Sequence, residues 1–287
     1  MSKLIKPSSL VVDPGATRAL QVRGLFVADG PTVWRNRVGN GYLNSVVPSL
    51  QRYTAGPAGM GGRFTATNVY ESFWSSVTNA QAPGSYGQRA TFFAVVSFES
   101  IGTNQIFGAF GAADGRWDIN MLVDSTDGFK TSYVDGGYTQ GGYQSIGAVP
   151  ALQTPHAIVV RASGSSHANV RSIHTSDGRS VVGAATRASY EEIGWASVAL
   201  NAGGQGEAAG FNGHVYQIGY ADKLWSDEEI GDYLEDPWRF LRPRSLVSRY
   251  GSAFAAAPPP PPPPSVTDDK MRSIARGVSR GVARGVA

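Results

Sequence analysis

Apolar and polar residues alternate with a period of two in many short segments, and this pattern is typical of β-strands. The strongest segment is Thr91–Phe98, which is rich in β-branched and aromatic residues. In the last predicted strand the two residue classes alternate from Val215 to Tyr220, which indicates a half-buried strand. The other predicted strands cover residues 105–110, 116–123, 129–134, 156–162, 168–175, 180–182 and 197–200, and the last strand covers 211–220.

Short turns separate these segments. Asp-Gly or Asn-Gly dipeptides, which suit the positive φ angles of tight hairpins, begin at positions 29, 40, 114, 127, 135, 177 and 212. No segment between the strands is long or periodic enough to form a crossover helix. The sequence therefore predicts an all-β fold, an antiparallel two-sheet jelly-roll sandwich, and not a fold of βαβ units.

The N-terminal part is less regular. We expect residues 1–22 to form an arm, with a short edge strand at Leu10–Val12. The other elements predicted here are a first hairpin made of 23–30 and 34–41, a loop at 51–62, and a strand at Phe64–Trp74 that re-enters the core.

A short helix is predicted after the last strand. Ser226 is a suitable N-cap, and Glu229 stands three positions later, as in a capping box. Pro237 ends the helix because proline cannot donate to the helical ladder. The apolar residues expected to pack onto the sheet are Ile230, Tyr233, Leu234, Trp238 and Phe240.

The segment Phe211–Arg244, with its Trp-Ser-Asp-Glu-Glu-Ile and Asp-Pro-Trp-Arg-Phe-Leu-Arg-Pro-Arg motifs, resembles the end of laminin-G-like, concanavalin A-like jelly-roll domains of bacteriophage and prophage proteins. In those families a strand is followed by a helix that begins with serine and acidic residues, and the Pro-Trp segment then packs back on the sandwich. The resemblance implies that residues 23–250 form such a domain, and that the protein belongs to a virion.

Two different segments follow the predicted domain. Residues 251–264 end in seven prolines, which favour a stiff polyproline II spacer of about 20 Å; a ligand for SH3 or WW domains is the alternative. Residues 265–287 repeat with a period of four and form a basic tail, which either orders on docking to a partner or stays disordered. The predicted docking residues are Arg272, Arg276, Arg280, Arg284, Gly277, Gly281 and Gly285.

Charge is distributed unevenly along the chain. The net charge is +3, but from Arg239 onward nine basic and two acidic residues give +7, which leaves −4 for the rest. This asymmetry indicates an acidic partner rather than general nucleic-acid binding, and the alternative is a tail that only keeps the protein in solution. There is no cysteine, so disulfides and thiolate sites are excluded and the redox argument leaves the compartment undetermined. There is no signal peptide and no run of ~18 apolar residues, so we expect synthesis in the host cytoplasm and no membrane association.

The sequence lacks the catalytic motifs of glycosidases, zinc hydrolases and serine hydrolases. An E-x-D-x-x-E pattern is absent, and the adjacent Glu191 and Glu192 would point to opposite faces of a strand. The sequence also lacks HExxH and G-x-S-x-G motifs. We therefore predict a protein that is not an enzyme, with a glycoside hydrolase as a disfavoured alternative. The histidines, predicted to be ordinary strand or surface residues, are His156, His167, His174 and His214.

Aromatic residues near glycine-rich loops suggest a sugar-binding surface, because aromatic rings stack on sugar C–H faces while Asp and Asn bind hydroxyls. Alternatively, these aromatics fill the core. The predicted ligand-binding residues are Asp135, Tyr138, Tyr143, Tyr190, Trp195 and Asn201. No cofactor is expected; calcium is a weaker alternative, for which the candidates are Asp114, Asp118, Asp124 and Asp127.

The leading hypothesis is a non-enzymatic phage virion protein, either a capsid decoration or a fibre or tail component. It would display a lectin-like jelly roll for adhesion to host-surface glycans, contact other virion proteins, and form a homo-oligomer. The alternative is a free carbohydrate-binding lectin module.

Overall fold

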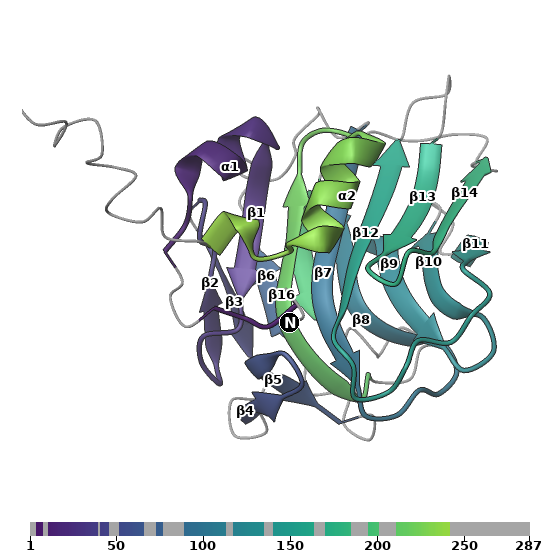
Figure 1. Cartoon of the computed structure of the whole chain (residues 1–287), viewed down its shortest axis with the longest axis horizontal. Helices are drawn as coiled ribbons and strands as arrows, with labels where there is room; N and C mark the ends of the chain where they lie inside the picture. Colours follow the sequence, from purple (N-terminus) through teal and green to yellow (C-terminus); the bar gives the residue numbers. More distant parts are fainter. Residues whose placement is uncertain are drawn as a thin grey trace, which may run out of the picture. The chain divides into compact units, whose positions relative to one another are not determined.

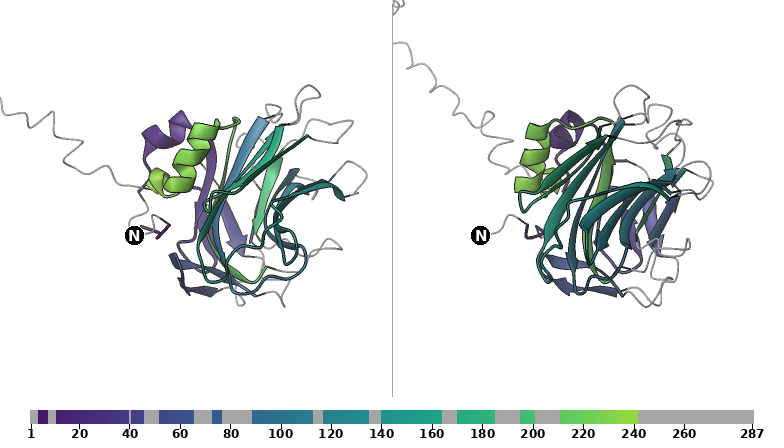
Figure 2. Two further views of the ribbon diagram at one scale, coloured as in Figure 1. Left: turned by 45° about the vertical axis from the view of Figure 1, so that its right-hand side comes forward. Right: turned by 90° about the vertical axis from the view of Figure 1, so that its right-hand side faces the viewer.

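The computed structural model describes residues 4–7, 11–39, 41–45, 52–65, 73–76, 89–112, 117–134, 140–163, 170–184, 195–200 and 211–241. In this part of the chain two eight-stranded sheets stack on each other, and every pair of neighbouring strands is antiparallel (Figures 1 and 2). The predicted all-β, two-sheet sandwich with a short C-terminal helix is confirmed. The predicted spacer and tail lie outside the described residues.

Sheet A has the order β14-β13-β12-β7-β16-β5-β4, and β1 pairs with the other half of β16. Its strands are β1 (Val22–Val27), β4 (Arg52–Gly56), β5 (Gly59–Phe64), β7 (Arg89–Phe98), β12 (His156–Ser163), β13 (Val170–Thr175), β14 (Ser180–Ala184) and β16 (Gly213–Ala221).

Sheet B has the order β11-β10-β9-β8-β15-β6-β3-β2. Its strands are β2 (Val33–Arg35), β3 (Tyr42–Ser45), β6 (Phe73–Ser76), β8 (Gln105–Ala112), β9 (Trp117–Asp124), β10 (Gly128–Val134), β11 (Gln140–Ser145) and β15 (Trp195–Leu200).

Two apolar layers hold this architecture together. The inner layer lies between the sheets and includes Trp34, Phe64, Phe98, Phe107, Met121, Phe129 and Val215. The outer layer lies between sheet A and the helices α1 (Pro14–Ala19), α2 (Asp227–Glu235) and η2 (Arg239–Leu241), which cover the front of the sheet in Figure 1. Its side chains include Phe93, Val95, Tyr216, Trp225, Tyr233, Trp238 and Phe240.

The last strand, β16, differs from its prediction. Each of its residues is buried, so it is not half-buried as the alternation indicated. Val215 faces the inner layer and Tyr216 the outer layer. The reason is that helices cover the second face of sheet A, and a two-residue alternation within one strand does not reveal this cover.

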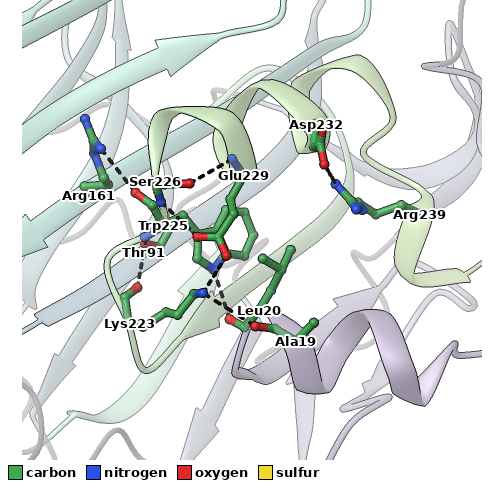
Figure 3. Close-up of polar contacts among 10 residues, drawn as sticks. All are labelled: Ala19, Leu20, Thr91, Arg161, Lys223, Trp225, Ser226, Glu229, Asp232 and Arg239. Carbon is green, nitrogen blue, oxygen red and sulfur yellow. Dashed lines mark hydrogen bonds and ion pairs between the residues drawn. The ribbon is translucent and has the colours of Figure 1, made fainter.

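Helix α2 begins with the predicted capping box, and contacts at its N-terminal end join it to sheet A (Figure 3). Ser226 Oγ accepts a hydrogen bond from the Glu229 backbone N–H, and the Glu229 carboxylate accepts one from the Ser226 N–H. The Trp225 indole stacks on Phe93 at 5.1 Å and donates to the Leu20 carbonyl at 3.0 Å. The closing segment therefore packs onto both α1 and sheet A.

The N-terminal predictions are partly wrong. Residues 14–19 form helix α1, with Asp13 as its N-cap and Pro14 in its first turn. The predicted hairpin of 23–30 with 34–41 is present only in part. One antiparallel bridge joins Phe26 to Asn36, and the Arg37 N–H donates to the Leu25 carbonyl at 2.8 Å. The full strand pairings are different, since β1 pairs with β16 in sheet A and β2 pairs with β3 in sheet B. Strand β1 is apolar on both faces: Phe26 enters the inner layer, and Leu25 and Val27 enter the outer layer.

Residues 51–62 were predicted to be a loop, but they contain most of the β4–β5 hairpin. The glycines that suggested a loop permit close packing instead. A Cβ at Gly61 would lie 2.7 Å from the Tyr216 ring, and one at Gly62 would lie 2.3 Å from the Trp34 ring. The predicted strand Phe64–Trp74 is also corrected, since Phe64 ends β5 and Phe73 begins β6.

Candidate functional site

The β2–β3 hairpin at one edge of sheet B presents two different faces. Trp34 and Leu43 point inward and are fully buried. Their neighbours on the outer face, Val33, Arg35 and Tyr42, are exposed, with relative exposures of 43% for Val33 and 54% for Tyr42. The alternation of strand side chains thus gives this edge a buried anchor and an exposed aromatic surface.

Arg35 and Tyr42 are neighbours on that surface because their backbones are partners in the β2–β3 register. Side chains at such paired positions have Cβ atoms roughly 5 Å apart, so the guanidinium and the phenol ring can contact one ligand together. We define the candidate site as the outer face of the hairpin, made of Val33, Arg35 and Tyr42.

The hairpin is held rigidly from behind. The Trp34 indole N–H donates to the Gly30 carbonyl at 2.9 Å. The Asn36 side-chain oxygen accepts the Leu25 N–H at 3.1 Å, and its amide donates to the Arg23 carbonyl at 3.1 Å. The Asn36 bonds tie the end of β2 to β1 of sheet A, and the Trp34 bond ties β2 to the segment that precedes it.

The same sheet continues from the hairpin into β6 and β15. Trp74 of β6 is paired in register with Asn44 of β3 on one side and with Ala199 of β15 on the other. Trp195, one of the predicted ligand-binding residues, lies on β15. The backbone therefore carries aromatic residues on three consecutive strands of sheet B.

The sequence-predicted sugar site is only partly covered by the structure. Asp135, Tyr138, Tyr190 and Asn201 lie outside the described residues, as do the predicted docking arginines and glycines of the tail. Tyr143 was predicted to lie in a loop but belongs to strand β11. Strands β10, β9 and β8 separate β11 from the β15 strand that contains Trp195, a distance of roughly 19 Å at ~4.8 Å per strand.

Sequence reasoning missed Arg35 and Tyr42. The signal was present in the alternation of exposed and buried side chains at Val33-Trp34-Arg35 and at Tyr42-Leu43. The prediction of one hairpin from 23–30 and 34–41 did not include the pairing of β2 with β3, and this pairing places Arg35 beside Tyr42.

Two of the calcium candidates face an ammonium group. Lys130 Nζ lies 2.5 Å from an Asp127 oxygen and 3.7 Å from an Asp124 oxygen. Burial alone raises the pKa of Asp124, but the backbone N–H groups of Thr126, Asn104 and Asp127, together with Lys130, give a net lowering of that pKa. These carboxylates therefore stabilise the β9–β10 turn. Within the described ranges, no three His, Asp or Glu side chains are grouped as metal ligands would be.

A second polar cluster lies on the outer side of sheet A. Arg63 donates two hydrogen bonds to the Glu99 carboxylate, at 2.8 and 2.7 Å, and so lowers the pKa of Glu99. His214 Nε2 lies 2.9 Å from Thr54 Oγ1, and burial lowers the pKa of this histidine. Because Arg63 and Glu99 satisfy each other, this cluster serves to fasten β5 to the end of β7.

The structure describes three of the histidines that were predicted to be ordinary strand or surface residues. His156, His174 and His214 all lie in strands of sheet A. The pKa of each is lowered, with burial as the largest cause. His156 and His214 are buried, and His174 is half-buried.

The sequence matches no protein-family model and no curated protein. Solved structures do match. A Trypanosoma rangeli sialidase in complex with 2,3-difluorosialic acid gives a TM-score of 0.54 at 11% identity, over 74% of this chain and 32% of the sialidase chain. The chain thus spans about a third of the sialidase.

Two further structures share the fold over 74% of this chain. Domain 4 of AbnA, a GH43 extracellular arabinanase from Geobacillus stearothermophilus, in complex with arabinotriose, gives a TM-score of 0.54 at 12% identity, and 97% of that domain is covered. The binding domain of botulinum neurotoxin serotype G gives a TM-score of 0.55 at 6% identity, with 50% of its chain covered.

These matches correct one prediction. The expectation that the protein is not an enzyme is contradicted, because chains with this fold come from a sialidase and an arabinanase. At 11–12% identity the likeness concerns the fold and assigns no activity to this chain. No helix among the described residues is long and apolar enough to cross a membrane.

Proposed function

We propose that this domain binds an oligosaccharide on the outer face of the β2–β3 hairpin. The observation that carries the proposal is the exposed Tyr42 ring beside the Arg35 side chain on a rigid edge of sheet B. An exposed tyrosine offers an apolar face for the C–H groups of a sugar ring. An arginine offers several N–H donors to its oxygen atoms.

Two of the other exposed apolar side chains that the structure describes lie without an exposed aromatic partner. Val182 on β14 is 64% exposed and Leu152 is 50% exposed. Single exposed apolar residues of this kind are ordinary on protein surfaces. At the hairpin, in contrast, an aromatic ring, an aliphatic side chain and a hydrogen-bond donor occupy one face.

The structural comparisons support a carbohydrate ligand. The arabinanase domain, matched over nearly its whole length, was solved with arabinotriose, and the sialidase was solved with a sialic acid derivative. These ligands belong to those proteins. They support the proposal because sandwiches of this kind occur in proteins that handle sugars.

A glycan array followed by calorimetry of the best ligand tests the proposal. Tyr42→Ala is expected to weaken binding about tenfold or more, which corresponds to about 1.4 kcal/mol. Val182→Ala, on sheet A, is the matched control and should bind as the natural protein does. Failure to bind any glycan, or equal affinity of the Tyr42→Ala variant, would refute the proposed site.

A second proposal concerns where the domain acts. The resemblance of Phe211–Arg244 to phage jelly-roll domains, with the proline-rich and basic segments that follow, supports display on a virion through the tail. In this proposal the tail contacts other virion proteins and the protein is a homo-oligomer. Full-length protein should co-sediment with assembled particles, whereas a variant ending at Ala257 should not. Equal sedimentation of both would exclude the tail as the anchor.

A further inference from the structure

We infer that the hairpin site recognises an acidic sugar, one that carries a carboxylate, such as a uronic or sialic acid residue. This inference rests on the proposed sugar-binding function. It adds the ligand class, and the observation behind it is the state of the Arg35 guanidinium.

Arg35 is an exposed cation without an internal counter-ion in the part of the chain that the structure describes. Most arginines with described side chains are neutralised by a carboxylate. The pairs are Arg23–Asp222, Arg37–Asp29, Arg63–Glu99, Arg161–Asp227, Arg179–Asp177 and Arg239–Asp232. Arg18, Arg35 and Arg52 form no such pair, and of these only Arg35 lies opposite an exposed tyrosine.

The charges nearest to Arg35 along the chain are already matched. Arg37, two residues further on, forms an ion pair with Asp29. Arg23 on β1 pairs with Asp222 at 2.5 Å. Among the residues that the structure describes, the outer face of the hairpin therefore keeps one positive charge, and a carboxylate on a ligand would complement it.

The shape of the guanidinium favours a carboxylate over other polar groups on the ligand. Its planar fork donates two parallel N–H bonds to a carboxylate, and such charge-assisted pairs are stronger than bonds to neutral hydroxyls. With Arg35 and Tyr42 side by side, a sugar ring lying on the tyrosine can place its carboxylate against the arginine. A neutral sugar would use the ring but leave the charge unmatched.

Another role for Arg35 would be to keep the edge of sheet B from pairing with other strands. β2 is an edge strand, and charged side chains at edges oppose aggregation. The two roles make different predictions. Lysine serves edge protection as well as arginine does, but it lacks the bidentate fork.

The experiment compares matched sugars. Oligogalacturonides, hyaluronan oligosaccharides and sialyllactose are each titrated in the free-acid and methyl-esterified forms, which differ in charge but not in ring structure. The free acid of at least one pair is expected to bind about tenfold more tightly than its ester, and this preference should weaken as salt rises from 50 to about 500 mM.

The variants separate the residue roles. Arg35→Gln should abolish the preference for the acid while retaining binding of the ester. Arg35→Lys should retain only part of the preference for the acid. Tyr42→Ala should weaken both forms. Thermal melting and light scattering check that each variant is folded and monodisperse.

The outcomes distinguish this inference from the proposed function. Equal binding of acids and esters, or a full preference in the Arg35→Gln variant, overturns the acidic-sugar inference and leaves sugar binding intact. If only neutral glycans bind on an array, the acidic-sugar inference is likewise overturned and sugar binding remains supported. If no glycan binds at all, the proposed function fails and the inference fails with it.

Discussion

The covered face of sheet A and the outer face of the β2–β3 hairpin use the same residue types in opposite ways. Under α2, the Arg161 guanidinium donates to Ser172 Oγ at 2.8 Å and to the Trp225 carbonyl at 3.1 Å, and it pairs with Asp227 at 2.8 Å. On the hairpin, Arg35 stands beside an exposed tyrosine without such partners among the described residues.

This difference teaches that an aromatic ring beside an arginine does not by itself define a binding site. In the covered face the protein's own groups satisfy the guanidinium, and the aromatic rings pack against one another. On the hairpin, the Arg35 guanidinium and the Tyr42 ring remain accessible to a ligand. Changes under α2 should therefore alter stability, whereas changes on the hairpin should alter binding.

The largest expected effect is at Trp225. The Trp225→Ala change should lower the free energy of unfolding by about 3–5 kcal/mol, because it leaves a cavity against Phe93 and removes the hydrogen bond to Leu20. Chemical denaturation measures the loss. Trp225→Phe keeps a ring at this position and should cost much less. A loss below about 1 kcal/mol for the alanine variant would mean that α2 is not docked as described.

A smaller effect is expected at the helix cap. Ser226→Ala removes the acceptor for the Glu229 N–H and should cost about 1 kcal/mol, measured by the same denaturation. Ser226→Asp retains an acceptor and should restore most of the stability. If the alanine and aspartate variants lose the same free energy of unfolding, the side-chain cap does not stabilise the start of α2.

Sheet A should also be sensitive to acid. Burial lowers the pKa of His156, His174 and His214 below the ordinary value of 6.5. The unfolded chain therefore binds more protons than the folded chain as pH falls through and below about 6.5, so stability is full above that pH and declines below it. Melting temperatures between pH 7.5 and 5 measure the slope, and His214→Gln should make it shallower. An unchanged slope would argue against a buried, neutral His214.

The smallest effect on stability is expected at the hairpin surface. Tyr42→Ala and Arg35→Gln should each change the free energy of unfolding by less than about 0.5 kcal/mol, because both side chains are exposed. The same variants should show the largest changes in sugar binding. A stability loss above about 1 kcal/mol for either variant would mean that the residue stabilises the fold, which argues against its role in ligand binding.

Local sequence signals predicted several elements of the described fold from Thr91 onward. The strand at Thr91–Phe98 and the pairing of 156–162 with 168–175 are present as β7 and as β12 with β13, and the capping box at Ser226 has the expected hydrogen bonds. These features depend on residues close together in the chain, namely a run of β-branched residues, two strands that follow each other in the sequence and a cap three positions from its partner.

The N-terminal half was predicted less well because its structure depends on distant partners. Strand β1 is placed by β16, nearly two hundred residues further on, and the glycines of β5 are explained by the rings of Tyr216 and Trp34. Without those rings a glycine-rich segment is indistinguishable from a loop.

The sequence by itself determined that this chain forms an antiparallel β-sandwich closed by a short capped helix, because alternation, turn dipeptides and caps are local properties. Only the tertiary structure decided which face of each strand is covered. Helices bury the second face of β16, while nothing among the described residues covers Arg35 and Tyr42. Burial depends on what packs from elsewhere in the chain, and for that reason the candidate site emerged from the fold and not from a motif.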